Sequence, residues 1–66
     1  MKLKDFVNVA VYNSYWVSVY IPGITGPVKE FKNTDKQRLR AYGDYILTGI
    51  WVLDEDTMCV RVMKGE

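Results

Sequence analysis

The sequence predicts a small α+β domain in which two β-hairpins build an antiparallel sheet and one or two short helices pack against it. Three observations lead to this fold class. Segments of alternating β-branched and aromatic residues occur in two pairs, a helix-start signal lies between the pairs, and 66 residues can form only one core. We therefore expect a single domain over residues 1–66 with the element order α-β-β-α-β-β.

The first thirteen residues fit two structures. Val7, Val9 and Val11 alternate as in a strand, whereas four residues have the spacing of one helix face: Leu3, Phe6, Val7 and Ala10. We predict a helix here, and a strand stays the alternative.

The first predicted hairpin joins residues 14–21 to residues 28–31 through a loop rich in glycine and proline. In the first of these strands Trp16 and Tyr20 share one face, because side chains alternate along a strand. At least one aromatic pair on this face is expected to point outward.

The segment between the hairpins carries the helix-start signal. Thr34 and Gln37 have the spacing of a capping box, in which both side chains satisfy the first free N–H groups of a helix. The helix that follows should end at Gly43, which is well placed as a glycine in the left-handed conformation.

The second predicted hairpin joins residues 45–53 to residues 57–63 around the acidic turn at residues 54–56. Strict alternation places Leu47 and Trp51 on the same face of the first strand. Because that strand is apolar on both faces, we expect it to be central in the sheet or to have its second face covered.

The residue types argue against an enzyme. The chain has no histidine for acid–base work, and Cys59 has no imidazole to deprotonate it, so a packed structural thiol is the better interpretation. The acidic turn is typical of a solvated loop, and weak calcium binding is the less favoured alternative. We predict no catalytic residue, no cofactor and no metal site.

Composition constrains partners and location. An apolar share of 48% is high for so short a chain, so we expect a homo-oligomer that covers part of this surface. A net charge of +1 argues against nucleic acid, and the absence of a long apolar run argues against a membrane span. A free thiol without an export signal predicts a cytoplasmic protein.

Two groups of residues are candidates for a binding surface. The first is a basic cluster, with five of the nine basic residues inside twelve positions and Phe31 between them. Its plain interpretation is a solvated face, and its functional one is a patch for an acidic protein surface, a nucleotide or RNA. The cluster consists of Lys29, Lys32, Lys36, Arg38 and Arg40.

The second candidate is the aromatic set, most of which we expect in the core or in subunit contacts. Trp16 and Tyr20 are the pair predicted to form the binding surface, because aromatic side chains on a sheet face can anchor a protein or stack bases. The set consists of Tyr12, Tyr15, Trp16, Tyr20, Tyr45 and Trp51.

The segments MKLKDFVNVAVYNSYWVSVYI and YGDYILTGIWVLDEDTMCVRV together resemble a pattern of small accessory proteins of phages and prophages in low-GC Gram-positive bacteria. The resemblance implies a phage-encoded protein in the bacterial host cytoplasm, of a group in which some members block host defence, as anti-CRISPR proteins do. It defines no functional residues. The chain lacks the acidic character usual in such proteins, which argues against nucleic-acid mimicry.

The leading hypothesis is therefore a non-enzymatic binding protein that inhibits or modulates a host protein through its aromatic sheet surface, as a homo-oligomer. One alternative is a nucleotide sponge that holds a signalling nucleotide between subunits. Another is a structural or assembly component of a virion.

Overall fold

The computed structural model describes residues 1–10 and 14–65, and it has the α+β class and the element order α-β-β-α-β-β that the sequence predicts. The first segment is a helix, as expected; Val11 and Tyr12 lie outside the described residues. The elements are α1 (Leu3–Val9), β1 (Trp16–Tyr20), β2 (Lys29–Lys32), α2 (Lys36–Tyr42), β3 (Ile46–Asp54) and β4 (Thr57–Met63).

Over the described residues, the strands form one sheet in the order β2-β1-β4-β3. Both hairpins, β1 with β2 and β3 with β4, are antiparallel, as expected. The hairpins meet through β1 and β4, which run parallel, so the sheet is mixed rather than wholly antiparallel. This order places β2 and β3 at the two edges.

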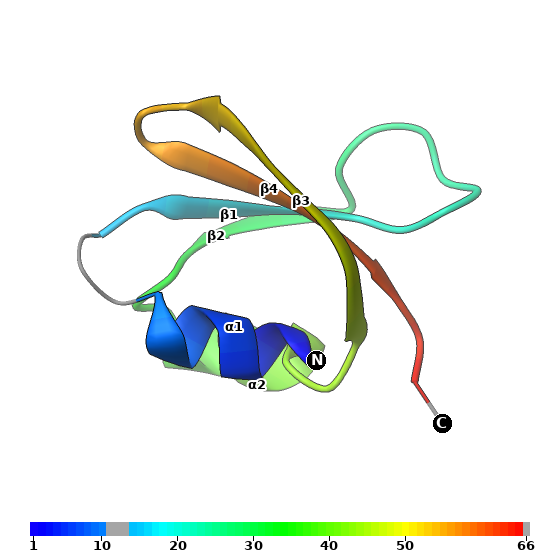
Figure 1. Ribbon diagram of the computed structural model, residues 1–66, viewed down its shortest axis with the longest axis horizontal. Helices are drawn as coiled ribbons and strands as arrows, with labels where there is room; N and C mark the ends of the chain where they lie inside the picture. Colours follow the sequence, from blue (N-terminus) through cyan, green and yellow to red (C-terminus); the bar gives the residue numbers. More distant parts are fainter. Residues whose placement is uncertain (11–13, 66) are drawn as a thin grey trace.

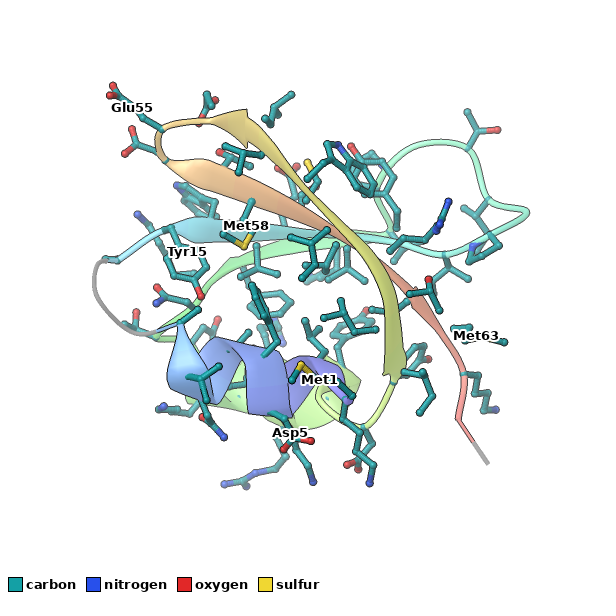
Figure 2. All side chains as sticks on the ribbon, in the orientation of Figure 1. Met1, Asp5, Tyr15, Glu55, Met58 and Met63 are labelled. Carbon is teal, nitrogen blue, oxygen red and sulfur yellow. The ribbon has the colours of Figure 1, made fainter. Side chains whose placement is uncertain are left out.

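Both helices lie on the same side of the sheet (Figure 1). Their apolar side chains meet those of the sheet and fill the space between the two layers (Figure 2). The alternation of the strands decides which side chains enter this core. Its buried members are Leu3, Val7, Ala10, Tyr15, Val17, Val19, Phe31, Leu39, Val60 and Val62.

The capping box predicted at Thr34 is wrong by one position. Asp35 is the N-cap of α2, and its carboxylate oxygen accepts a hydrogen bond from the Arg38 N–H at 3.1 Å. The backbone N–H of Asp35 donates to the Lys32 carbonyl at 2.9 Å, so the turn before the helix extends to Asp35. The helix therefore begins one residue later than the capping-box spacing predicts.

The left-handed conformation predicted for Gly43 is also wrong, because its φ is −65° and its ψ is −25°. A glycine is nevertheless needed here. A β-carbon at this position would collide with the Leu39 carbonyl oxygen and would lie 2.8 Å from the β-carbon of Lys4. Close approach of α1, rather than backbone conformation, explains the residue.

The first two residues bind the beginning of β3. Leu47 donates its N–H to the Met1 carbonyl at 2.8 Å, and Lys2 forms an antiparallel bridge with Ile46. The edge of β3 is thus covered at residues 46–47.

The face assignment along residues 45–53 needs correction. A bulge between Leu47 and Gly49 shifts the register, so Leu47 lies opposite Val62 and packs on the core. Trp51 lies opposite Cys59 on the other face. The expectation of a central or covered strand is wrong too, since β3 is an edge strand with exposed apolar residues on both faces.

A candidate binding surface on the outer face of the sheet

The face of the sheet that points away from the helices carries three aromatic rings. Trp16 and Tyr20 come from β1, and Trp51 comes from β3. We call these three residues the aromatic face. The alternation of β1 produces it: Val17 and Val19 enter the core on one side, so Trp16 and Tyr20 point to the other, as the sequence predicts.

Two of the rings meet across the strand that separates them. The ring centroids of Tyr20 and Trp51 are 5.2 Å apart, with an angle of 45° between their planes. Cys59 of β4 is paired with Trp51 on one side and with Ser18 on the other, and both small side chains are buried although they lie on the outer face. The aromatic rings are thus supported by a packed layer of small side chains.

The third ring stands beside a cation. The Lys32 Nζ lies 4.9 Å from the centroid of the Trp16 ring, within the range of a cation–π contact. Trp16 and Trp51 keep 41% and 42% of their surface exposed. Both tryptophans therefore combine a fixed position with a free surface.

Polar groups flank the rings. Thr48 donates its hydroxyl to the Arg61 carbonyl at 3.0 Å, and the Arg61 Nε donates to the Thr48 hydroxyl oxygen at 3.4 Å. This arrangement holds the guanidinium against Gly49, the residue paired with Arg61 in the ladder. Together with Glu30 and Lys32 on β2, Arg61 gives the aromatic face a border of mixed charge.

Cys59 has the environment of a structural thiol. Burial raises the pKa of the thiol, and a hydrogen bond with Tyr20 opposes that rise. Because the thiolate is the nucleophilic form, a raised pKa works against reactivity.

The basic cluster of the sequence does not form one surface. Lys32 lies beside Trp16, whereas Lys36 and Arg40 line a shallow depression of about 350 Å³ between the helices, together with Lys4. Lys29 sits half-buried on the edge strand β2.

Phe31 has to be removed from the predicted binding surface. Only 2% of it is exposed, and its ring stacks on that of Tyr42 in the core, with 6.1 Å between centroids and 17° between planes. Its position on β2 alternates inward, opposite Val17. Arg38 is exposed on α2, close to the N-cap that it completes.

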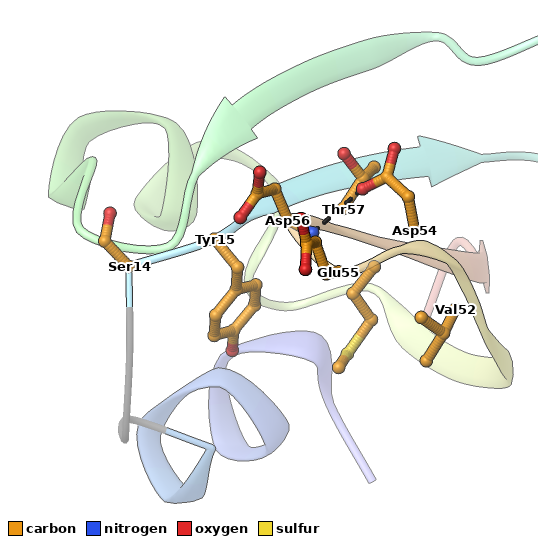
Figure 3. A pocket seen from close by; sticks show the side chains of 8 residues that line it. Ser14, Tyr15, Val52, Asp54, Glu55, Asp56 and Thr57 are labelled. Atoms are coloured by element: carbon orange, nitrogen blue, oxygen red, sulfur yellow. Dashed lines mark hydrogen bonds between the residues drawn. The ribbon is translucent and has the colours of Figure 1, made fainter.

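A second hollow of about 420 Å³ lies where the turn between β3 and β4 approaches Tyr15 (Figure 3). Within the turn, the Asp56 N–H donates to the Asp54 carboxylate at 2.8 Å. The acidic side chains of the turn are exposed, in keeping with a solvated loop. Across residues 1–10 and 14–65 there is no group of three histidine, cysteine or acidic residues that could hold a metal ion.

Sequence reasoning did not place Trp51 with Trp16 and Tyr20. The aromatic set included Trp51, but strict alternation placed Trp51 on the same face as Leu47. The bulge between Leu47 and Gly49 reverses this assignment, and no sequence pattern indicates the bulge. Of the other aromatic residues, Tyr15 is buried in the core and its hydroxyl donates to the Ala10 carbonyl at 2.8 Å.

Comparison of the chain with protein-family models, with curated proteins and with solved structures found no match. Within the described part of the chain, neither helix has the length and apolar character needed to cross a membrane.

Proposed function

We propose that this chain is a non-enzymatic protein-binding domain whose aromatic face contacts a partner protein. The observation that carries the proposal is the fixed, half-exposed position of Trp16 and Trp51 on the face opposite the helices. Residues of this type supply most of the binding free energy in protein interfaces when they fill pockets on a partner.

The arrangement of the aromatic face resembles the centre of an interface. Tyr20 and Trp51 pack against each other and Lys32 lies against Trp16, so the rings lose little conformational entropy when a partner covers them. The charged residues stand at the border, as in interfaces that have an apolar centre and a polar rim.

A protein is favoured over nucleic acid because the border of the aromatic face carries both signs of charge. Glu30 is paired with Ser18, next to Lys32 on the same strand, and Arg61 lies beyond β1. Stacking surfaces for single strands combine aromatic rings with a continuous basic groove. The division of the basic cluster between the two sides of the molecule does not provide such a groove.

The chemical class of the partner follows from these groups. It should present an apolar pocket or ridge to the tryptophans and carboxylates to Lys32 or Arg61. That the partner is a host defence protein, and that the chain comes from a phage, stays a prediction from the resemblance.

The test begins with a pull-down from a lysate of a Gram-positive bacterium, and the captured partner is then titrated against purified variants. Trp16→Ala and Trp51→Ala should each weaken binding by about 30-fold, because truncation of a central aromatic anchor costs about 2 kcal/mol or more. Val9→Ala is the matched control, since Val9 is an exposed apolar residue on α1.

Raised salt should weaken a contact through the aromatic face only slightly, whereas phosphate contacts lose affinity steeply. If both tryptophan variants keep wild-type affinity and wild-type circular dichroism, the aromatic face is not the binding surface. Loss of binding in Val9→Ala alone would move the contact to the helices.

A further inference from the structure

The edge strand β3 exposes four consecutive large apolar residues. Val52 and Leu53 keep 66% and 64% of their surface exposed, and Ile50 and Trp51 are also exposed. β3 is the last strand in the sheet order, so one side of its backbone has no neighbouring strand over the described residues. An exposed, apolar edge is a template for pairing with another strand.

The opposite edge of the sheet is protected in the usual ways. β2 has only four residues, and three of them, Lys29, Glu30 and Lys32, are charged. β3 has nine residues, with no charge over residues 46–53. Since residues 1–2 cover the edge at residues 46–47, the open part begins at Thr48.

We propose that β3 pairs antiparallel with β3 of a second copy of this chain and joins two sheets into one. A two-fold axis perpendicular to the sheet relates such copies, and paired residues must then lie on the same face. The axis therefore lies midway between one residue of β3 and the same residue of the second copy. If the axis lies at Trp51, Ile50 of each copy is paired with Val52 of the other copy. No charged residue then lies in the middle of the new strand pair.

The charges at the ends of β3 are complementary in this register. The acidic turn at residues 54–56 of one copy comes to residues 46–48 of the other, where Met1 and Lys2 are bound to the edge. Antiparallel pairing thus brings the turn with three carboxylates next to the Lys2 ammonium. The strand is self-complementary both in its apolar centre and at its charged ends, which favours a second copy over an unrelated peptide.

The size of the chain gives independent support. A domain of this length buries only about 60% of the surface of its unfolded chain, and no disulfide can form within a chain that has one cysteine. Among the described residues, pairing at β3 would cover the longest run of exposed large apolar side chains. It would also place the two aromatic faces side by side on one continuous sheet, but it does not depend on their having a partner.

The experiment is sedimentation equilibrium of wild-type protein and of two double variants at micromolar concentration. Wild type should have about twice the chain mass of 7.7 kDa. Ile50→Lys with Val52→Lys places like charges directly opposite each other across the axis and should give a monomer. Ile50→Glu with Val52→Lys places opposite charges there and should keep the dimer, with a dissociation constant that rises with salt.

The two double variants change the same exposed positions, so each serves as the control for the other, and circular dichroism verifies that both are folded. A monomeric wild type would overturn the proposal, as would equal masses for the two folded double variants. Trp16→Ala should stay dimeric because β1 lies two strands away from β3. A monomeric Trp16→Ala would place the contact on the aromatic face and refute pairing at β3.

Discussion

Two glycines of this chain, Gly43 and Gly49, lie outside the left-handed region but differ in what a side chain would meet. At Gly43 a β-carbon would strike a backbone carbonyl of α2 and the base of the Lys4 side chain. At Gly49 the nearest atom is the flexible end of Arg61, at 3.4 Å. Substitution by alanine should therefore destabilise the fold much more at Gly43 than at Gly49.

Gly43→Ala should lower the free energy of unfolding by about 1–3 kcal/mol, because the added methyl group forces α1 away from the end of α2. Gly49→Ala should change it by less than about 1 kcal/mol, since alanine suits a strand better than glycine does. Urea denaturation of both variants measures the difference. An equal or stabilising effect at Gly43 would show that α1 adjusts freely at this contact.

At the same scale, alternation in the sequence could place Trp16 and Tyr20, because β1 is regular. It could not place Trp51, because the bulge after Leu47 reverses the faces of β3. For Phe31, the charges on either side drew attention to the basic cluster, although its position in the strand is an inward one. The bulge between Leu47 and Gly49 thus decides that Trp51 lies on the same face as Trp16 and Tyr20.

At the scale of the element, α2 is a helix of seven residues, for which the first turn matters. Asp35→Ala should lower the free energy of unfolding by about 1 kcal/mol, because the Arg38 N–H loses its acceptor. Asp35→Asn should keep most of that stability, since an amide oxygen can accept the same bond.

Thr34→Ala is the matched control, because Thr34 is the residue that the sequence pattern favours as the cap. It should change the free energy of unfolding by less than about 0.5 kcal/mol, as is usual for an exposed position. Thermal unfolding of the three variants under identical conditions decides between the two positions. A larger loss in Thr34→Ala than in Asp35→Ala would contradict the observed cap.

The elements themselves could be predicted because each is a local pattern: β-branched alternation, turn residues and a polar helix start. Which strands lie next to each other in the sheet could not be predicted. The parallel pairing of β1 with β4 joins residues about forty positions apart, and nothing in either strand specifies the other. This pairing puts β3 at the edge, so the apolar run that suggested a central strand is instead a surface.

At the scale of the whole molecule, the described residues form two layers, the sheet and the pair of helices. Both helices cover one face of the sheet, so the aromatic face and the β3 edge keep apolar residues at the surface. In our proposals the first surface contacts a partner protein and the second contacts a second copy, and Trp51 belongs to both. The two contacts can be tested separately, because Trp16→Ala should weaken binding of the partner and stay dimeric, whereas Ile50→Lys with Val52→Lys should prevent dimer formation.

Ion pairs also join the N-terminal residues to the connection between α2 and β3. Asp44 lies in the connection between α2 and β3. Its Oδ1 is 2.8 Å from the Lys4 Nζ and 3.7 Å from the Lys2 Nζ. The hydrogen bond from Lys4 lowers the pKa of the Asp44 carboxyl below its ordinary value of 3.8 and raises the pKa of the Lys4 ammonium above its own. The pair therefore ties α1 to the beginning of β3.

A carboxyl whose pKa is lower in the folded state stabilises the fold above its unfolded pKa and loses this effect as the pH falls through its folded pKa. Asp44→Asn should thus be less stable than wild type at pH 7, and the difference should shrink as the pH falls below 3.8. Both groups are at the surface, so the difference should be small and should decrease with salt. Urea denaturation between pH 7 and pH 2, at one protein concentration, measures it.

Glu30→Gln provides the comparison, because it removes an exposed carboxylate on β2 that takes part neither in the contact of Asp44 with α1 nor in the proposed pairing of β3. Its unfolding free energy is measured over the same pH range as a reference for the loss of a surface carboxylate outside this contact. If Asp44→Asn also runs parallel to wild type down to pH 2, the ion pair does not hold the N-terminal helix in solution. The covered part of the β3 edge would then depend on the hydrogen bond from Leu47 to Met1 and on the Lys2 bridge.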